Sequence, residues 1–69
     1  MNRFKDLRED RNLTQKEVAY ILKTTQQQYS KIENGKADIS GEKLILLANY
    51  YKTSTDYILG LTNDPTPSK

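Results

Sequence analysis

The sequence predicts an all-α domain, a compact five-helix bundle that contains a helix-turn-helix. Apolar residues recur at helical spacing in five segments, polar N-cap residues precede three of these segments, and no strand signals are present. At 69 residues the chain is one small domain. We expect the folded domain at residues 1–61 and a flexible C-terminal tail at residues 62–69, where both prolines lie.

The first two helices are predicted from an apolar face and from a capping signal. The first covers about residues 2–10, with Phe4 and Leu7 on one face. The second has Thr14 as its N-cap residue, and Glu17 follows three residues later, which predicts a capping box. The apolar stripe of the second helix consists of Val18, Ala19 and Leu22.

The third helix is predicted between a threonine cap and a glycine. Thr25 is its N-cap residue, and Gln28 stands at the capping-box position. Tyr29 and Ile32 are expected to point inward. Gly35 ends the helix, because glycine readily takes the left-handed conformation after a helix.

The last two helices follow a loop at residues 36–40. The fourth helix is expected at about residues 41–51. The fifth has Ser54 as its N-cap residue, carries Asp56 in its first turn, and stops at Gly60. The apolar residues at helical spacing in these two helices are Leu44, Leu47, Ala48, Tyr51, Ile58 and Leu59.

The composition excludes several classes of function. The chain has no Cys and no His, which removes disulfides, Cys/His zinc sites and histidine bases. The acidic residues show no ligand spacing, and three glycines do not form a phosphate loop, so we expect no metal, no cofactor and no enzymatic activity. The charged start at residues 1–10 is unlike a signal peptide, and the longest aliphatic run has five residues. We therefore expect a cytoplasmic protein without a membrane partner.

The charge is divided unevenly along the chain. Residues 1–36 contain eight Lys or Arg and five Asp or Glu, whereas residues 37–69 contain three and four. The first half is therefore basic, with a net charge of +3, and the second half has a net charge of −1. This asymmetry favours a polyanionic partner for the half that contains the third helix.

A turn of 100° per residue divides the third helix into two faces. A polar arc of about 140° contains Gln26, Gln27, Ser30, Lys31 and Asn34, and Gln28 lies opposite with the apolar residues. A glutamine amide can donate to and accept from adenine in the major groove, so the outward glutamines are candidates for reading DNA bases. A solvated helix start is the alternative explanation for Gln26 and Gln27. Gln28 is expected to cap Thr25.

The ordered motifs of the chain resemble the phage-repressor helix-turn-helix family, the Cro/cI-type or XRE-type DNA-binding domain. The resemblance runs from about Phe4 to Leu61. Its carriers are the segments LTQ at 13–15, VA at 18–19, Leu22, SKIENGK at 30–36, Leu44, LA at 47–48 and STDYILG at 54–60. The segment TTQQQ at 24–28 is particularly similar to the recognition helix of lambdoid phage repressors.

The resemblance implies a sequence-specific double-stranded DNA-binding transcriptional regulator, a bacterial or phage repressor with helix 25–34 in the major groove. It assigns base contacts to Gln26, Gln27, Lys31 and Ser30. It assigns phosphate contacts to Gln15, Asn34, Lys36 and Gly35, and it has Gln15 bracing the first recognition glutamine. Arg8 and Glu33 match a structural ion pair of the family. Arg3, Lys5 and Arg11 are further phosphate candidates.

A homodimer is expected because one helix reads only a few base pairs. Two copies would bind half-sites of a short pseudo-palindrome about 34 Å apart. We place candidate dimer contacts near the fifth helix, at Tyr57, Leu59 and Leu61, although these residues could instead close the monomer core. No small-molecule ligand is expected.

Lys23 departs from the usual pattern of the family. Lys23 occupies the turn position where the family usually has glycine, a position that often needs a positive φ.

The alternative function is a protein-interaction module of the same fold, an antitoxin or a regulator-binding partner, with DNA binding secondary. Its surface would be supplied by tyrosines, which elsewhere are more often core residues: Tyr20, Tyr50, Tyr51 and Tyr57.

Overall fold

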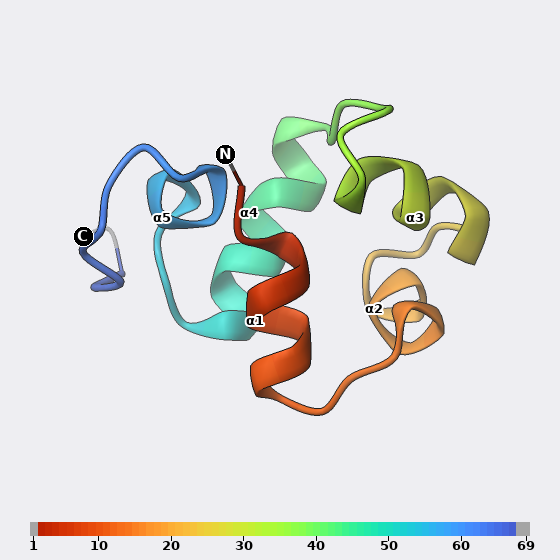
Figure 1. Ribbon diagram of the computed structural model, residues 1–69, viewed down its shortest axis with the longest axis horizontal. Helices are drawn as coiled ribbons and strands as arrows, with labels where there is room; N and C mark the ends of the chain where they lie inside the picture. Colours follow the sequence, from red (N-terminus) through yellow and green to blue (C-terminus); the bar gives the residue numbers. More distant parts are fainter. Residues whose placement is uncertain (1, 68–69) are drawn as a thin grey trace.

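The computed structural model describes residues 2–67, and within them every regular element is a helix (Figure 1). The five helices are α1 (Phe4–Asp10), α2 (Gln15–Ile21), α3 (Gln26–Glu33), α4 (Gly41–Tyr51) and α5 (Thr55–Leu59). The predicted all-α class is confirmed. The first helix begins two residues later than expected, because Arg3 has non-helical torsion angles and its N–H donates to the Ile58 carbonyl. Within the described range, no helix is long and apolar enough to cross a membrane.

Four of the five helices begin with a hydroxyl side chain that caps the first turn. Thr14, Thr25, Ser40 and Ser54 each have extended torsion angles and accept a hydrogen bond from the backbone N–H three residues later. The predicted capping box at Thr14 is complete, since the Glu17 side chain also accepts from the Thr14 N–H. Each cap satisfies one of the N–H groups that a helix start leaves without a partner.

All five helices end in the same pair of backbone hydrogen bonds, the Schellman motif. The motif needs one residue with a positive φ after the last helical turn. The residues at that position are Asn12, Lys23, Gly35, Lys52 and Gly60. The φ of Lys23 is 57°, which confirms the predicted positive φ in the turn between α2 and α3.

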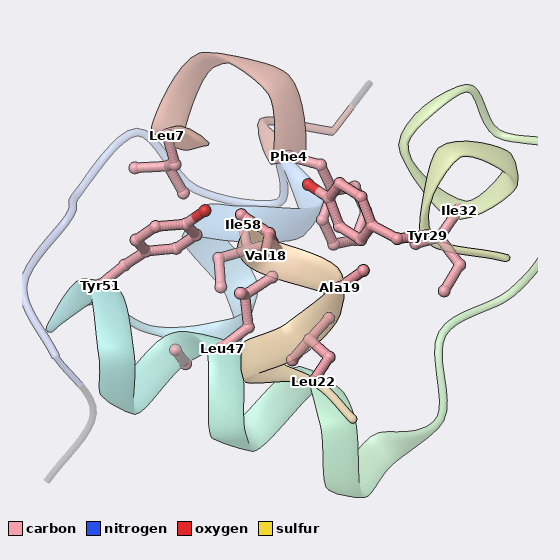
Figure 2. Packing of buried hydrophobic residues seen from close by; sticks show 11 residues of the cluster. Phe4, Leu7, Val18, Ala19, Leu22, Tyr29, Ile32, Leu47, Tyr51 and Ile58 are labelled. Carbon is pink, nitrogen blue, oxygen red and sulfur yellow. The ribbon is translucent and has the colours of Figure 1, made fainter. Parts of the chain in front are cut away.

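The core lies where all five helices meet (Figure 2). Figure 2 shows the fully buried Val18 and Leu47 near its centre, with Tyr51 from α4 and Tyr29 from α3 on its two sides. The other buried apolar residues are Phe4, Leu7, Ala19, Leu22, Ile32, Ala48 and Ile58. Burying a side chain of this size contributes about 1.5–3 kcal/mol, so this cluster fixes α2 and α3 against the rest of the domain.

Hydrogen bonds hold the segment after α5 against the beginning of the chain and against the connection between α4 and α5. The Arg3 guanidinium donates to the carbonyls of Tyr57 and Thr62 and to the Asn63 side chain. The Thr53 hydroxyl donates to the Pro65 carbonyl at 2.7 Å. The boundary at residue 61 and the mobility of the tail remain predictions, and residues 1, 68 and 69 of those two ranges lie outside the described residues.

Candidate nucleic-acid interface

The third helix presents the polar face that the sequence predicted. Gln26, Gln27 and Lys31 are exposed and Ser30 is half-buried, whereas Tyr29 on the opposite face is fully buried. The side chains of Tyr29, Ile32 and Glu33 point into the domain, so the helix cannot rotate to present another face without emptying the core. Residue order and burial therefore fix the orientation of α3.

A shallow hollow of about 450 Å³ lies over this face and brings the candidate base contacts together. Its lining residues come from the start of α2 and from α3: Gln15, Gln26, Gln27, Ser30 and Lys31. The lining offers amide and hydroxyl groups that both donate and accept hydrogen bonds, together with one cation. Such a surface suits polar, anionic partners, and none of its lining residues is aliphatic or aromatic.

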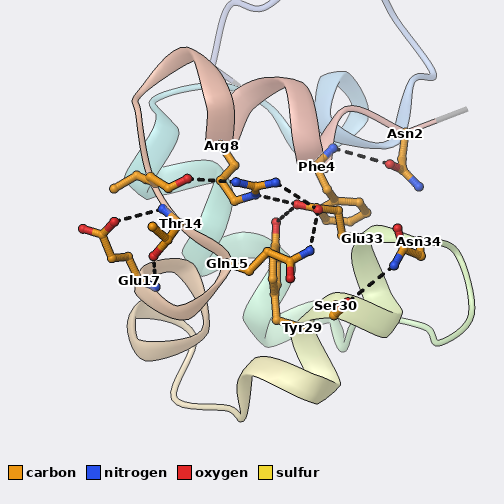
Figure 3. Close-up of polar contacts among 11 residues, drawn as sticks. Asn2, Phe4, Arg8, Thr14, Gln15, Glu17, Tyr29, Ser30, Glu33 and Asn34 are labelled. Atoms are coloured by element: carbon orange, nitrogen blue, oxygen red, sulfur yellow. Dashed lines mark hydrogen bonds and ion pairs between the residues drawn. The ribbon is translucent and has the colours of Figure 1, made fainter.

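Behind the hollow, the carboxylate of Glu33 collects four hydrogen bonds (Figure 3). Its Oε1 atom accepts from Arg8 Nε at 2.8 Å and from the Tyr29 hydroxyl at 3.1 Å. Its Oε2 atom accepts from Arg8 Nη2 at 3.2 Å and from Gln15 Nε2 at 2.8 Å. Arg8 also donates to the Leu13 carbonyl at 2.9 Å. The Arg8–Glu33 ion pair thereby joins the end of α3 to α1 and to the start of α2.

The surroundings of Glu33 keep it ionised although its side chain is only 3% exposed. Burial works against the charge, but hydrogen bonds from Arg8, Gln15 and Tyr29 outweigh it and leave the pKa of Glu33 below its ordinary value. The hydrogen bond to Glu33 raises the pKa of Arg8 in turn. Burial raises the pKa of the Tyr29 hydroxyl, so this group stays neutral and donates. A fully satisfied ion pair of this kind adds no net charge to the surface in front of it.

The predicted phosphate contacts lie at two separate places. Gln15 lines the hollow, but its amide is bonded to Glu33, and within residues 2–67 it makes no hydrogen bond to Gln26, the bracing partner that the resemblance implied. The other three residues lie at the opposite end of α3: Asn34, Gly35 and Lys36 are all exposed. Gly35 has a φ of 76° and nothing near its Cα that a side chain would meet, so its backbone is open to a ligand.

Gln28 differs from its prediction. Its N–H donates to the Thr25 hydroxyl at 3.0 Å, as a capping box requires. Within residues 2–67 its side chain makes no return bond to Thr25, and it is exposed. Only half of the capping box is present, and Gln28 is absent from the hollow that Gln26 and Gln27 line.

The three candidate dimer contacts do not form one exposed patch. Leu59 is partly buried against the core, and Tyr57 is partly buried with the Arg3 guanidinium 4.1 Å above its ring. Leu61 is 73% exposed. Only Leu61 therefore offers a mostly free apolar side chain at the end of α5.

Two arginines considered as phosphate contacts are used inside the domain. Arg3 bonds to the segment after α5, as described above. Arg11 donates to the Tyr51 carbonyl at 2.8 Å and lies 4.7 Å from the centre of the Tyr51 ring. Lys5, the third candidate, is exposed. Among the residues that the structure describes, no group of three acidic, His or Cys side chains could hold a metal ion.

Two members of the Glu33 cluster, Tyr29 and Gln15, were not predicted from the sequence. Tyr29 precedes Glu33 by four residues on the same helix, a spacing that places the two side chains side by side and could have indicated their contact. The bond from Gln15 joins residues 18 positions apart on two helices. No local spacing predicts it, because it depends on how α2 and α3 pack.

Comparison with known proteins agrees with this arrangement. Residues 4–58 match a family model described as helix-turn-helix. The chain is 37% identical over 65 residues to the uncharacterized HTH-type transcriptional regulator YobD of Bacillus subtilis strain 168, an overlap of 94% of this chain and 58% of that protein. The chain thus spans less than two thirds of the length of this relative. No solved structure matches the chain. Because the matched segment runs from the start of α1 into α5, the chain belongs to the helix-turn-helix family.

Proposed function

We propose that this protein is a sequence-specific regulator of transcription that binds double-stranded DNA with α3 in the major groove. The observation that carries the proposal is the polar face of α3, on which Gln26, Gln27, Ser30 and Lys31 line one hollow. The family membership supports it, as does the name of the Bacillus relative, an HTH-type transcriptional regulator.

The base contacts follow from the chemistry of the exposed side chains. Gln26 and Gln27 can each donate to N7 and accept from N6 of adenine, so both favour A·T pairs. Lys31, one turn further along the helix, favours a guanine or a phosphate. Ser30 has a hydroxyl that suits either a base or the backbone. The amide of Asn34 donates to this hydroxyl at 3.4 Å.

Phosphate contacts are proposed at both ends of the reading helix. Gln15 contributes a neutral amide at the start of α2. Lys36 contributes a charge beyond the end of α3, beside the exposed backbone of Gly35 and the side chain of Asn34. Contacts at both ends would fix the register of the helix on the duplex, while the bases between them supply the specificity.

We propose that two copies bind a short pseudo-palindrome and repress transcription by occupying the operator. The domain is 30 Å long in its longest direction, which is comparable to the ~34 Å between half-sites one helical turn apart. We therefore propose that two copies lie side by side on one face of the duplex. Leu61 is the side chain near α5 that is free to contact a second copy.

A protein-interaction module is the second candidate. Tyr20 is 85% exposed, and it lines an apolar hollow together with Leu13, Ile21 and Tyr50. Large exposed aromatic side chains are typical anchors of protein interfaces. On this account the contact with DNA would be secondary to a partner protein at the Tyr20 surface.

The salt dependence of binding to a random-sequence duplex distinguishes the two candidates. Labelled duplex is titrated with protein between 50 and 200 mM salt, and fluorescence anisotropy gives the Kd. The DNA account predicts binding that weakens steeply with salt, and Lys36→Gln should reduce the slope of log K against log salt by about 1. Lys52→Gln is the matched control, because Lys52 is exposed at the end of α4 away from α3 (Figure 1). Absent or salt-independent binding would favour the interaction module.

A further inference from the structure

We propose that Glu33 is a positioning residue for DNA binding, because its buried carboxylate holds the Gln15 amide in the orientation that presents one N–H to a phosphate. This inference rests on the proposed function. It goes beyond the structural ion pair with Arg8, since it gives the same carboxylate a role in the contact with DNA.

The two oxygens of Glu33 serve different purposes. Both accept from Arg8, but only Oε1 accepts from Tyr29 and only Oε2 accepts from Gln15. The Tyr29 bond lies within α3 and the Gln15 bond reaches across to α2 (Figure 3). Tyr29 and Gln15 can therefore each be substituted without removing the bond that the other residue makes to Glu33.

One N–H group of the Gln15 amide is bonded to Glu33, and the second is available to another acceptor. Its nitrogen carries two N–H groups, and the bond to Glu33 uses one of them. The side chain is half-buried and lines the hollow in front of α3, so the second N–H remains near the surface where the duplex would lie. A side chain that is already held loses less rotamer freedom on binding than a free glutamine does.

The charge of Glu33 does not oppose this role. An unpaired carboxylate near the duplex would repel phosphate, but Arg8 lies 2.8 Å away and neutralises it. Because Gln15 is itself neutral, its contact releases no counterion from DNA. The loss of Gln15 is therefore expected to weaken binding by the same factor at every salt concentration, unlike the loss of Lys36.

A double-mutant cycle tests the inference. One arm is Gln15→Ala. The other replaces both ions, Arg8→Met with Glu33→Met, since a glutamine at 33 could still accept from Gln15 and removing one ion alone would leave a buried charge without its partner. The Kd for duplex DNA is measured for wild type, both arms and their combination, at a temperature where all four are folded. We expect each arm to weaken binding roughly three- to tenfold. We expect the combined variant to have a Kd no higher than that of the arm that binds DNA more weakly.

Two outcomes would overturn the inference. If wild type binds DNA and the losses of the two arms multiply in the combination, Glu33 does not act through Gln15, while the proposed function stands. If wild type binds no duplex at any salt concentration, the proposed function fails and this inference fails with it. Tyr29→Phe is the matched control: it removes a bond to the same carboxylate, so it should lower the Tm and leave the Kd unchanged.

A measurement on the wild-type protein covers the case in which the methionine pair does not fold. The side-chain NH₂ signals of Gln15 and Gln28 are compared by nitrogen-15 NMR, with and without duplex DNA. We expect one Gln15 proton to be shifted downfield in the free protein and to stay so on DNA, while its second proton moves when DNA is added. Gln15 protons that resemble those of the exposed Gln28 would overturn the inference.

Discussion

Lys23 and Gly35 occupy the same position in the same motif at the ends of α2 and α3. Each follows the C-cap residue of its helix and has a positive φ, 57° for Lys23 and 76° for Gly35. In both motifs the N–H of the next residue donates to the carbonyl five residues earlier, from Thr24 to Ala19 and from Lys36 to Lys31. The turn between α2 and α3 therefore has the same backbone geometry as the end of α3. In this turn a lysine stands at the left-handed position, where glycine is the least strained residue.

Lys23→Gly should stabilise the domain. A left-handed conformation costs a residue with a Cβ roughly 1–2 kcal/mol, and glycine avoids most of this cost but has more freedom to lose on folding. We expect a gain of up to about 1 kcal/mol, which corresponds to roughly 4–8 °C in Tm for a domain of this size. Thermal unfolding followed by circular dichroism measures it.

Lys23→Ala is the control for this substitution. It removes the amine but keeps the Cβ, so it should leave the Tm nearly unchanged. If Lys23→Gly lowers the Tm by several degrees while Lys23→Ala leaves it unchanged, loss of the lysine side chain does not explain the difference, and the assignment of strain to this turn is wrong.

Gln27→Ala should change specificity more than affinity for random DNA. A bidentate contact with adenine contributes about 1–3 kcal/mol of discrimination at one base pair. Competition between a selected site and single-base variants of it measures this loss. Gln28→Ala is the matched control, since Gln28 is an exposed glutamine on the same helix but lies outside the hollow. An equal loss on every sequence would make Gln27 a phosphate contact instead.

Acid should destabilise the domain through Glu33. The folded state lowers the pKa of this carboxyl below its ordinary value of 4.5, so the unfolded chain binds the proton more tightly. Its contribution to the free energy of unfolding is therefore fully present above about pH 4.5 and is lost as the pH falls through the lower, folded value. Denaturant unfolding between pH 3 and pH 7 (about the range in which a carboxyl titrates) measures how the free energy of unfolding changes with pH.

The variant with Arg8→Met and Glu33→Met provides the comparison for this experiment. It should unfold with a weaker dependence on pH than wild type, since the titrating carboxyl and its cation are both absent. A pH dependence identical to that of wild type would show that Glu33 does not contribute to acid sensitivity.

The sequence predicted the helices and the exposed polar face of α3 well, because both depend on local chemistry. Thr14, Thr25 and Ser54 cap the helices at which they were expected, and the polar arc of α3 follows from residue spacing alone. The Gln15–Glu33 bond and the tether from Arg3 to Asn63 could not be predicted, since each depends on the packing of distant elements. Gln28 shows the limit of a local signal: the residues of the capping motif are present, but within residues 2–67 the Gln28 side chain makes no bond to Thr25.

The two buried tyrosines should respond in opposite ways to loss of the hydroxyl. The Tyr29 hydroxyl donates to Glu33, so Tyr29→Phe should cost about 1–2 kcal/mol. The Tyr51 hydroxyl is buried and has no hydrogen-bond partner within residues 2–67, and burial raises the pKa of Tyr51 to about 12. Tyr51→Phe should therefore be neutral or stabilising. Urea unfolding of both variants tests the contrast, and equal losses would contradict it.

Selection of bound duplexes from a random pool tests most directly whether α3 reads DNA. The account predicts that wild type enriches a short pseudo-palindrome with half-sites about one helical turn apart and with A·T pairs opposite Gln26 and Gln27. Gln27→Ala should enrich the same site with the preference lost at one position in each half. A pool that shows no enriched sequence, or an enriched site that Gln27→Ala leaves unchanged, would contradict it.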